Sequence, residues 1–338
     1  MDYRLLGPSG IRVSPLCLGT MMFGGATDAA TARRIVGMAR DAGVNFIDTA
    51  DVYTAGESER IVGAAIAPDR DHWVVATKAG NRAGEDVNAR GLSRRWLMRA
   101  IEASLDRLGL DHVDLYYLHR EDPETPLAET VAAMGALITA GKVRHFGLSN
   151  FRAWRHAEVV RLCDAQGVPR PVASQPYYNA FNRMPEVEVI PACAHFGLGV
   201  VPYSPIARGV LSGKYRPGEP PPPDTRAGRG DKRILESEFR PESLALAQKV
   251  KAHAEARGLT TAQFAFAWVI ANRHVTAALA GPRTADQFAE YLGALEARLG
   301  TEDEAFVDAL VPPGHPSTPG YNDPAYPLEG RPPRPAGS

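Results

Sequence analysis

The sequence is poor in cysteine, has no long apolar run and carries no excess of either charge. It has three cysteines, Cys17, Cys163 and Cys193, and a set that is both small and odd in number does not form a disulfide framework. We therefore expect a reducing compartment. Met1 is followed by Asp2 and not by the apolar stretch of a signal peptide. No segment approaches the roughly 18 apolar residues of a membrane span. We therefore expect a cytoplasmic protein that does not associate with membranes.

The charge balance also excludes some partners. Lysine and arginine number 38, aspartate and glutamate number 39, and the formal net charge is −1 over 338 residues. The arginines are dispersed and form no basic block, so the sequence predicts no binding to nucleic acid or to an anionic membrane.

The motifs of several enzyme classes are absent as well. No G-x-G-x-x-G follows an expected strand, so the common dinucleotide fingerprint is missing. The lack of H-E-x-x-H and C-x-x-C argues against a protein-bound metal, and no G-x-S-x-G marks a hydrolase nucleophile. The segment Gly209–Lys214 is one residue too short for a phosphate-binding loop, and Tyr215 stands where that loop needs serine or threonine.

What the sequence does contain is a regular alternation of short apolar runs with longer amphipathic stretches. We expect strands at Pro15–Leu18, Asn45–Thr49, Trp73–Thr77, Val113–Leu118, Val143–Leu148, Val172–Ser174, Gly199–Pro202 and Val275–Ala280. We expect helices at Thr31–Asp41, Glu57–Ile66, Ser93–Leu108, Leu127–Thr139, Trp154–Ala165, Val187–Phe196, Ser243–Ala256, Thr261–Ala271 and Asp286–Ala297. This alternation predicts an α/β protein with parallel strands, closed into one (β/α)8 TIM barrel over residues 1–338. A doubly wound open sheet is the alternative.

Three segments fall outside the repeat. Residues 3–13 place Gly-Pro-Ser-Gly between two short apolar arms, which predicts an N-terminal β-hairpin. Residues 215–240 form a long loop after the seventh strand, with four consecutive prolines, and this loop is either a functional lid or locally disordered. Residues 312–338 are rich in proline and glycine and predict an extended C-terminal tail.

Polar residues follow one apolar strand after another, always at the carboxyl end, where barrel enzymes place their chemistry. These strand-end residues are Asp48 and Tyr53, Lys78, His119, Ser149 and Asn150, Gln175, Tyr203 with Ser204 and Pro205, and Gly281 with Arg283. Packing alone does not explain that asymmetry. By contrast, we expect Asp51 to be a polar loop residue without a role in the chemistry.

At these positions the sequence resembles the aldo-keto reductase superfamily. The matching motifs are Asn45–Tyr53, the strand ends at Lys78 and His119, the Ser149-Asn150 pair and Tyr203–Gly209, and the resemblance covers roughly residues 3 to 297. It implies that Asp48, Tyr53, Lys78 and His119 form a catalytic tetrad. It also implies that the cofactor is NADPH, with NADP+ in the reverse reaction, bound without the missing glycine fingerprint.

The reduction of a carbonyl group requires a hydride on carbon and a proton on oxygen. Tyrosine is a poor acid at its ordinary pKa of about 10, and a neighbouring cation such as Lys78 lowers that pKa. Asp48 can pair with Lys78 and hold it in place. Tyr53 then acts as general acid in reduction and as base in the reverse oxidation. His119 can donate a hydrogen bond that polarises and orients the carbonyl oxygen.

The resemblance further implies which residues bind the cofactor. Ser149, Asn150 and Gln175 would bond the nicotinamide carboxamide, Tyr203 would stack on the ring, and Arg283 would meet the 2′-phosphate through its planar fork of donors. The whole implied set is Gly19, Thr20, Met21, Asp48, Ser149, Asn150, Gln175, Tyr203, Ser204, Pro205, Ile206, Arg208, Gly209, Leu211, Gly213, Lys214, Gly281, Arg283 and Gln287.

One departure concerns the adenine end. Where the family pattern ends in Glu-Asn, this chain has Glu290-Tyr291, so one amide contact to adenine is missing. Tyr291 either stacks on adenine or packs in the core, and the preference for NADPH over NADH then depends mainly on Arg283.

These observations predict a reductase of aldehydes or ketones whose partner is a small-molecule carbonyl substrate. A cofactor-binding regulatory subunit with little turnover is the alternative, and a barrel with sugar or phosphate chemistry is a weaker one. The expected pocket walls are Met21, Met22, Phe23, Tyr53, the Asn81–Arg90 loop and the proline-rich loop after the seventh strand. The apolar methionine and phenylalanine side chains favour aromatic or aliphatic carbonyls. The oligomeric state stays open, with a homo-oligomer as one alternative.

Overall fold

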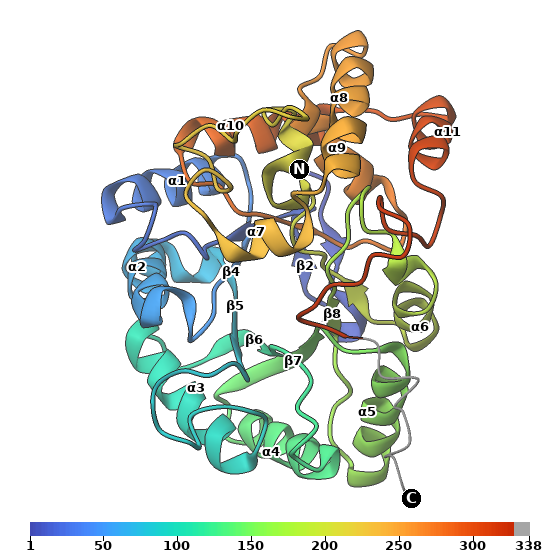
Figure 1. Cartoon of the computed structure of the whole chain (residues 1–338). Coiled ribbons are helices and arrows are strands. Elements are labelled where there is room, and N and C mark those ends of the chain that lie inside the picture. The colour runs from blue at the N-terminus through green and yellow to red at the C-terminus, as the bar shows by residue number, and fades with distance from the viewer. Residues whose placement is uncertain (328–338) are drawn as a thin grey trace, which may run out of the picture.

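The computed structural model describes residues 1–327 and shows a ring of parallel strands surrounded by helices (Figure 1). The strands are β3 (Leu16–Gly19), β4 (Phe46–Asp48), β5 (Val74–Ala79), β6 (Val113–Leu118), β7 (Val143–Ser149), β8 (Ala173–Gln175), β9 (Gly199–Val200) and β10 (Ala278–Ala280). Each strand pairs with the next along the chain, and β10 lies beside β3. A parallel bridge between Val200 and Val275 closes the ring. The predicted (β/α)8 barrel is confirmed, and the open sheet is excluded.

Helices connect the strands on the outside of the barrel. They are α1 (Ala29–Asp41), α2 (Glu57–Ile66), α3 (Arg94–Leu108), α4 (Leu127–Thr139), α5 (Ala153–Gln166), α6 (Val189–Phe196), α8 (Pro241–Ala256), α9 (Thr261–Ala271) and α10 (Ala285–Gly293). Helix α3 shows how local sequence sets these bounds. The Ser93 hydroxyl accepts a hydrogen bond from the Trp96 amide at its start, and Gly109 ends it in the left-handed conformation.

The core has two parts. One lies between the strands and the helix shell. The other fills the barrel and includes Leu6, Phe46, Leu115 and Val201, all without exposed surface. Leu6 belongs to the predicted N-terminal hairpin, which forms from β1 (Arg4–Leu5) and β2 (Arg12–Val13) and closes the bottom of the barrel. Gly7 beside it has a φ of +53°, and a Cβ there would lie 2.2 Å from the Val172 carbonyl oxygen, so only glycine fits.

Two helices were not expected from the sequence. Helix α11 (Thr301–Leu310) buries only Asp303 and Val307, so it has almost no apolar periodicity to detect. Helix α7 (Lys232–Ser237) lies inside the 215–240 segment, and the Asp231 carboxylate caps it by accepting from the Ile234 amide. The segment is folded, and the Ala227 amide donates to the Tyr215 hydroxyl across it at 3.3 Å. We call residues 215–240 the lid.

The tail from residue 312 contains no helix or long strand up to Pro327, and the remainder of the predicted tail, residues 328–338, lies outside the described residues. In Figure 1 the described part runs from the rim of the molecule toward the barrel opening, with α7 on the other side of that opening. Asp323 of the tail forms an ion pair with Arg233 of α7 through both carboxylate oxygens, and Arg233 Nη1 lies 3.0 Å from Asp323 Oδ1. The Arg240 guanidinium of the lid lies 3.7 Å from the centroid of the Tyr321 ring. The tail and the lid are therefore joined above the barrel.

Two further findings concern expectations from composition. Cys17, Cys163 and Cys193 are all buried free thiols. Among residues 1–327, no helix has both the length and the apolar character to cross a membrane.

Candidate active site

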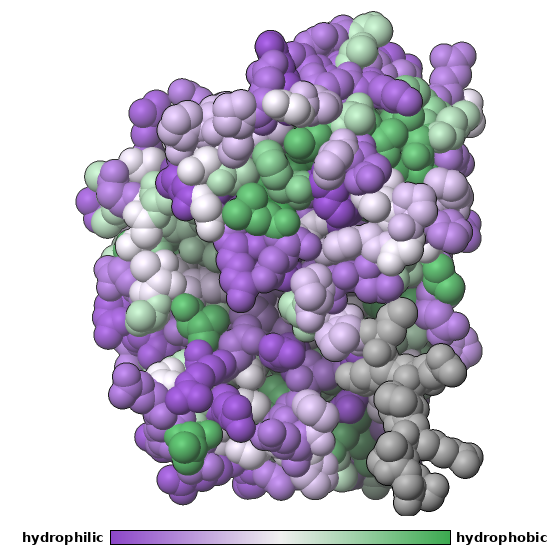
Figure 2. All heavy atoms as spheres, in the orientation of Figure 1, coloured by the Kyte–Doolittle hydropathy of each residue, from purple (hydrophilic) through white to green (hydrophobic). Residues whose placement is uncertain are grey.

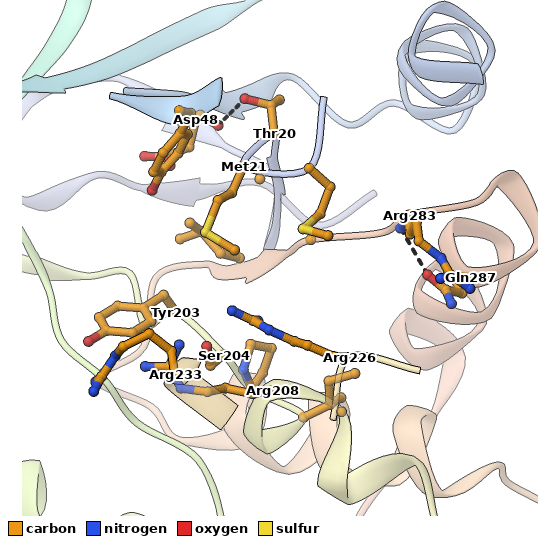
Figure 3. A pocket seen from close by; sticks show the side chains of 18 of the residues that line it. Thr20, Met21, Asp48, Tyr203, Ser204, Arg208, Arg226, Arg233, Arg283 and Gln287 are labelled. Carbon is orange, nitrogen blue, oxygen red and sulfur yellow. Dashed lines mark hydrogen bonds between the residues drawn. The ribbon is translucent and has the colours of Figure 1, made fainter. Parts of the chain in front are cut away.

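The carboxyl ends of the barrel strands surround a pocket with a volume of about 520 Å³. Figure 2 shows the same face hollowed at its centre, with mainly hydrophilic residues around the hollow. In the close view of Figure 3, Asp48, Thr20 and Met21 lie on one side of the pocket and Tyr203, Ser204 and Arg208 on the other, while Arg283 and Gln287 lie at the far end. The pocket is thus elongated, with the predicted tetrad at one end.

Most of the predicted cofactor residues line this pocket. They are Gly19, Thr20, Met21, Asp48, Ser149, Asn150, Gln175, Tyr203, Ser204, Pro205, Ile206, Arg208, Gly209, Lys214, Gly281, Arg283 and Gln287. Leu211 and Gly213 of the predicted set are not among its lining residues. The Leu211 side chain packs in the core, and Gly213 ends a 3-10 helix with its amide on the Val210 carbonyl, because this short helix turns its other face to the pocket.

The four predicted tetrad residues meet at the strand ends of β4, β5 and β6. The Lys78 ammonium forms an ion pair with Asp48, and it also donates to the Thr49 carbonyl at 2.7 Å and to the Tyr53 hydroxyl at 3.3 Å. Both charged side chains are at most 1% exposed. The Gln175 amide donates to the second Asp48 oxygen at 3.0 Å, so the buried carboxylate has partners on both oxygens.

Burial and charge act in opposite directions on these groups. Burial lowers the pKa of Lys78, but Asp48 and Tyr53 more than offset it, so the pKa is raised and the ammonium stays charged. Burial also raises the pKa of Tyr53, and Lys78 only partly counteracts this. The expected lowering effect of Lys78 is present, but burial outweighs it, so the pKa of Tyr53 lies above its ordinary value. Tyr53 keeps its proton at neutral pH, which suits a general acid.

His119 faces Tyr53 edge to face, with the ring centroids 5.9 Å apart. Burial first, and the charges of Lys78 and Arg120 next, place its pKa well below the ordinary value, so the ring is neutral. Among the described residues its Nδ1 atom is buried without a hydrogen-bond partner. A neutral imidazole retains one N–H donor, which matches a group that polarises a carbonyl oxygen.

A hydrogen-bonded polar group lies beside the tetrad. The Asn150 amide donates to the His119 carbonyl at 3.0 Å and to the Ser149 hydroxyl at 3.1 Å, and the Tyr203 hydroxyl donates to the Asn150 side-chain oxygen at 2.8 Å. The Tyr203 ring stacks on Tyr177 at a centroid distance of 5.2 Å. These contacts hold an amide and a flat aromatic face at the pocket wall.

Strained backbone is concentrated at these strand ends. Outside glycine, positive φ values occur at Thr54, Ala55, Asn150, Ser204, Ala207 and Arg208 among the described residues. Such conformations cost about 1–3 kcal/mol each and persist where the surrounding structure holds a functional group in place. Asn150, Ser204 and Arg208 all line the pocket.

The loop after the seventh strand lines the pocket, as predicted, but its individual pocket residues and one tail residue were not named from the sequence. Arg226, Arg229 and Arg233 reach the pocket from the lid, and Tyr326 reaches it from the tail. Their signal was present as a spacing of three to four residues between arginines in a loop, but no periodic element indicated which way they point. Tyr291 also lines the pocket and packs on Phe266 with ring centroids 5.4 Å apart, so packing is its role in this structure.

Metal ligands are not grouped anywhere in the part of the chain that the structure describes, since no cluster of three His, Cys, Asp or Glu side chains occurs there.

Asp51, which we expected to be a polar loop residue, is instead buried. It is only 5% exposed, and neither carboxylate oxygen has a hydrogen-bond partner among the described residues. Burial and then the charge of Glu59 raise its pKa to about 7, with Arg107 and Lys78 acting against this. Asp51 lies directly behind the tetrad, between the Lys78 strand and the Glu59–Arg107 ion pair.

We expect replacement of Asp51 by asparagine to stabilise the protein above pH 7. The unfolded-state pKa is about 3.9, so the folded protein holds a proton that the unfolded chain has lost between about pH 4 and 7, and stability falls as pH rises through that window. The substitution should therefore raise the free energy of unfolding above pH 7 by at most about 4 kcal/mol. Thermal unfolding at pH 5 and pH 8 measures it, with exposed Asp71→Asn as control. A melting temperature of Asp51→Asn that is equally shifted at both pH values would contradict the assignment.

Comparison with known proteins agrees with this geometry. Residues 15–312 match the model of the Aldo/keto reductase family. This chain belongs to the aldo/keto reductase family. The family generally uses a nicotinamide dinucleotide, and the resemblance first seen in the motifs is confirmed.

The chain is also similar to named members of different kinds. It is 36% identical over 301 residues to a "Probable voltage-gated potassium channel subunit beta" of Oryza sativa subsp. japonica, covering 88% of this chain and 92% of that protein. A protein of the same name from Arabidopsis thaliana has the same identity and coverage. The "Uncharacterized oxidoreductase YrpG" of Bacillus subtilis is 35% identical over 323 residues, covering 92% and 96% of the two chains.

Proposed function

We propose that the protein is an NADPH-dependent reductase that converts aldehydes or ketones to alcohols. The observation that carries this proposal is the buried Lys78–Asp48 ion pair placed 3.3 Å from the Tyr53 hydroxyl at the end of a long, partly cationic pocket. This arrangement offers a proton donor and a means of stabilising the phenolate that remains once the proton has left.

The residues present fit a nicotinamide dinucleotide. Asn150, Ser149 and Gln175 provide amide and hydroxyl groups at the tetrad end, and Tyr203 offers a flat face there. Arg226, Lys214 and Arg283 provide cations farther along the pocket, as a phosphate-bearing ligand requires. When bound, the cofactor supplies the hydride that reduces the carbonyl carbon.

The residues of the chain supply the rest of the reaction. His119 donates its N–H to the carbonyl oxygen and fixes its orientation, while Tyr53 transfers its proton to that oxygen as the carbon is reduced. Lys78 then stabilises the Tyr53 phenolate by charge and by its hydrogen bond, and Asp48 keeps Lys78 in place. A proton from solvent restores the Tyr53 hydroxyl, and the product is the alcohol.

The decisive test is the oxidation of NADPH by the purified protein with a reactive aromatic aldehyde, together with a fluorescence titration with NADPH alone. We expect saturable binding and turnover that depends on the aldehyde. The pocket walls at the tetrad end include Met21, Met22 and Val52, which favour an apolar or aromatic carbonyl substrate. Binding without turnover across a panel of aldehydes would contradict the enzymatic proposal.

A regulatory subunit that binds the cofactor is the second candidate, because two plant relatives are named as probable potassium channel subunits. The complete tetrad favours the enzyme, since a pure binding role does not require a buried Lys78–Asp48 pair beside Tyr53. Tight NADPH binding with no aldehyde-dependent turnover is the result expected of such a subunit.

A further inference from the structure

A buried acidic group lies beside the tetrad and has no role in the steps described above. Asp51 is 5% exposed, and neither of its carboxylate oxygens has a hydrogen-bond partner within residues 1–327. Its backbone amide donates to the Lys78 carbonyl oxygen at 3.1 Å, and the Thr49 amide donates to the Ala76 carbonyl oxygen at 2.9 Å. The loop that carries both Asp51 and Tyr53 is therefore attached to β5, the strand of Lys78, which keeps the Asp51 carboxyl group close to the tetrad.

Glu59 of α2 is a second buried acid in this region, and both of its oxygens have partners. The Thr77 hydroxyl donates to one oxygen and the Arg107 Nε atom to the other, each at 2.6 Å. Arg107 reaches Glu59 across Gly56, which has a φ of +89°, and a Cβ there would lie 2.6 Å from the Arg107 Cδ atom. The Arg107 guanidinium is thus bound to Glu59, and the Asp51 carboxyl group has no cation of its own.

The charged and ionisable groups around Asp51 come from several elements of the barrel. They are Glu59 of α2, Arg107 of α3, Lys78 of β5, Tyr116 of β6 and Tyr53 of its own loop. Burial and then the like charge of Glu59 raise the pKa of Asp51 to about 7, while Arg107 and Lys78 act against this. A buried carboxylate without a partner is costly, so Asp51 changes its charge close to neutral pH.

The charge of Asp51 acts on proton transfer at Tyr53. When Tyr53 gives its proton to the carbonyl oxygen of the substrate, a phenolate remains, and a second negative charge in the same buried region opposes that change. Burial raises the pKa of Tyr53, Lys78 counteracts it, and the charges of Asp48 and Asp51 raise it further. Asp48 is neutralised by its ion pair with Lys78, whereas Asp51 adds its charge only after it has lost a proton.

We propose that Asp51 controls by its charge how readily Tyr53 gives up its proton. Reduction is favoured while Asp51 is protonated, and it slows once Asp51 ionises. This inference rests on the proposed function for the role of Tyr53 as general acid. Asp51 is not among the residues that line the pocket, so it acts through Tyr53 and not by contact with the substrate or the cofactor.

Single-turnover reduction of a reactive aromatic aldehyde by the NADPH-loaded protein measures the chemical step without product release. For the wild-type protein we expect the rate constant to fall about 3- to 10-fold as the pH rises through about 7, the effect of one buried charge on a proton transfer. For Asp51→Asn the rate constant should stay high across the same range. Asp71→Asn, which removes an exposed acid, is the control and should keep the wild-type step.

Glu59→Gln tests whether the step in the pH profile belongs to Asp51. The substitution removes the like charge that raises the pKa of Asp51 and frees the Arg107 charge to lower it, so the step should move to lower pH without disappearing. A fluorescence titration with NADPH shows whether this variant is folded, and the Asp51→Asn profile decides the question without it. A step that remains near pH 7 in Asp51→Asn would overturn the proposal.

The ionisation of Tyr53 can also be measured without turnover. Subtracting the ultraviolet titration of Tyr53→Phe from that of the wild-type protein isolates the tyrosinate signal of Tyr53, and the same subtraction is made in the Asp51→Asn background. We expect Tyr53 to ionise at lower pH in the Asp51→Asn background. That result without aldehyde turnover would support the role of Asp51 and contradict the reductase proposal. Turnover with the same Tyr53 ionisation in both backgrounds would overturn the role of Asp51 and leave the reductase proposal intact.

Discussion

Tyr53→Phe is expected to reduce carbonyl turnover by roughly 10²- to 10⁴-fold, the usual contribution of a general acid, with little change in cofactor affinity. The substitution removes one oxygen atom, which accepts a single 3.3 Å hydrogen bond from Lys78. The ion pair between Lys78 and Asp48 and the donation to the Thr49 carbonyl remain. The site should therefore keep its shape and lose its proton donor. Steady-state NADPH oxidation with a reactive aldehyde, beside a fluorescence titration, measures both effects.

Tyr177→Phe provides the matched control for this experiment. Tyr177 stacks on Tyr203 beside the pocket, and its hydroxyl is buried without a hydrogen-bond partner among the described residues. Loss of that hydroxyl should leave turnover nearly unchanged. Full activity of Tyr53→Phe would contradict the proposed mechanism. A loss of turnover in Tyr177→Phe equal to that in Tyr53→Phe would show that the packing of the pocket, and not proton transfer, had been disturbed.

Lys78→Met is expected to abolish reduction and also to destabilise the fold by about 3–5 kcal/mol. It leaves the Asp48 carboxylate buried with only the Gln175 amide and no cation, and it removes the charge that stabilises the Tyr53 phenolate. Chemical denaturation and the turnover assay should therefore change together. This combined loss is expected to be the largest of any single substitution at the site.

The double variant Asp48→Asn/Lys78→Met separates the two effects. It removes both buried charges, so we expect a large part of the lost stability to return, because no uncompensated charge remains. Activity should stay low, since Tyr53 still lacks its cation. Recovery of turnover together with stability would show that the pair supports the fold and has no part in the reaction.

Closure of the barrel decides which buried carboxylates at the site have a partner. Asp48, Lys78 and Gln175 come from β4, β5 and β8, and only ring closure brings Gln175 within 3.0 Å of Asp48 across the barrel. The same closure leaves Asp51 behind the tetrad without a partner. A fold that aligns the carboxyl ends of eight strands thus pairs one acidic side chain and isolates another three residues away.

The barrel, the N-terminal hairpin and most of the helix bounds could be predicted from the sequence alone. Helices α2 and α4 begin and end at the expected residues, because their apolar positions recur with helical spacing. Helix α9 also does, although it is buried on nearly all sides; the Thr260 cap marks its start. The four candidate tetrad residues could also be named from the sequence, because their motifs resemble those of the family and each of them lies at or just after the end of an expected strand. Helix α11 was missed because it buries almost no apolar residue.

How these residues act on each other depends on contacts that form only in the folded barrel. Whether Lys78 lowers the pKa of Tyr53 below its ordinary value depends on the balance between charge and burial, and burial prevails. The approach of Arg229 to Arg283 and of Asp323 to Arg233 depends on the path of the lid and the tail, which have no periodic pattern that predicts direction. Side-chain periodicity is a local property, whereas desolvation and charge proximity arise from segments far apart in the chain. The sequence therefore indicated which residues lie at the site, but not how burial and charge together shift their pKa values.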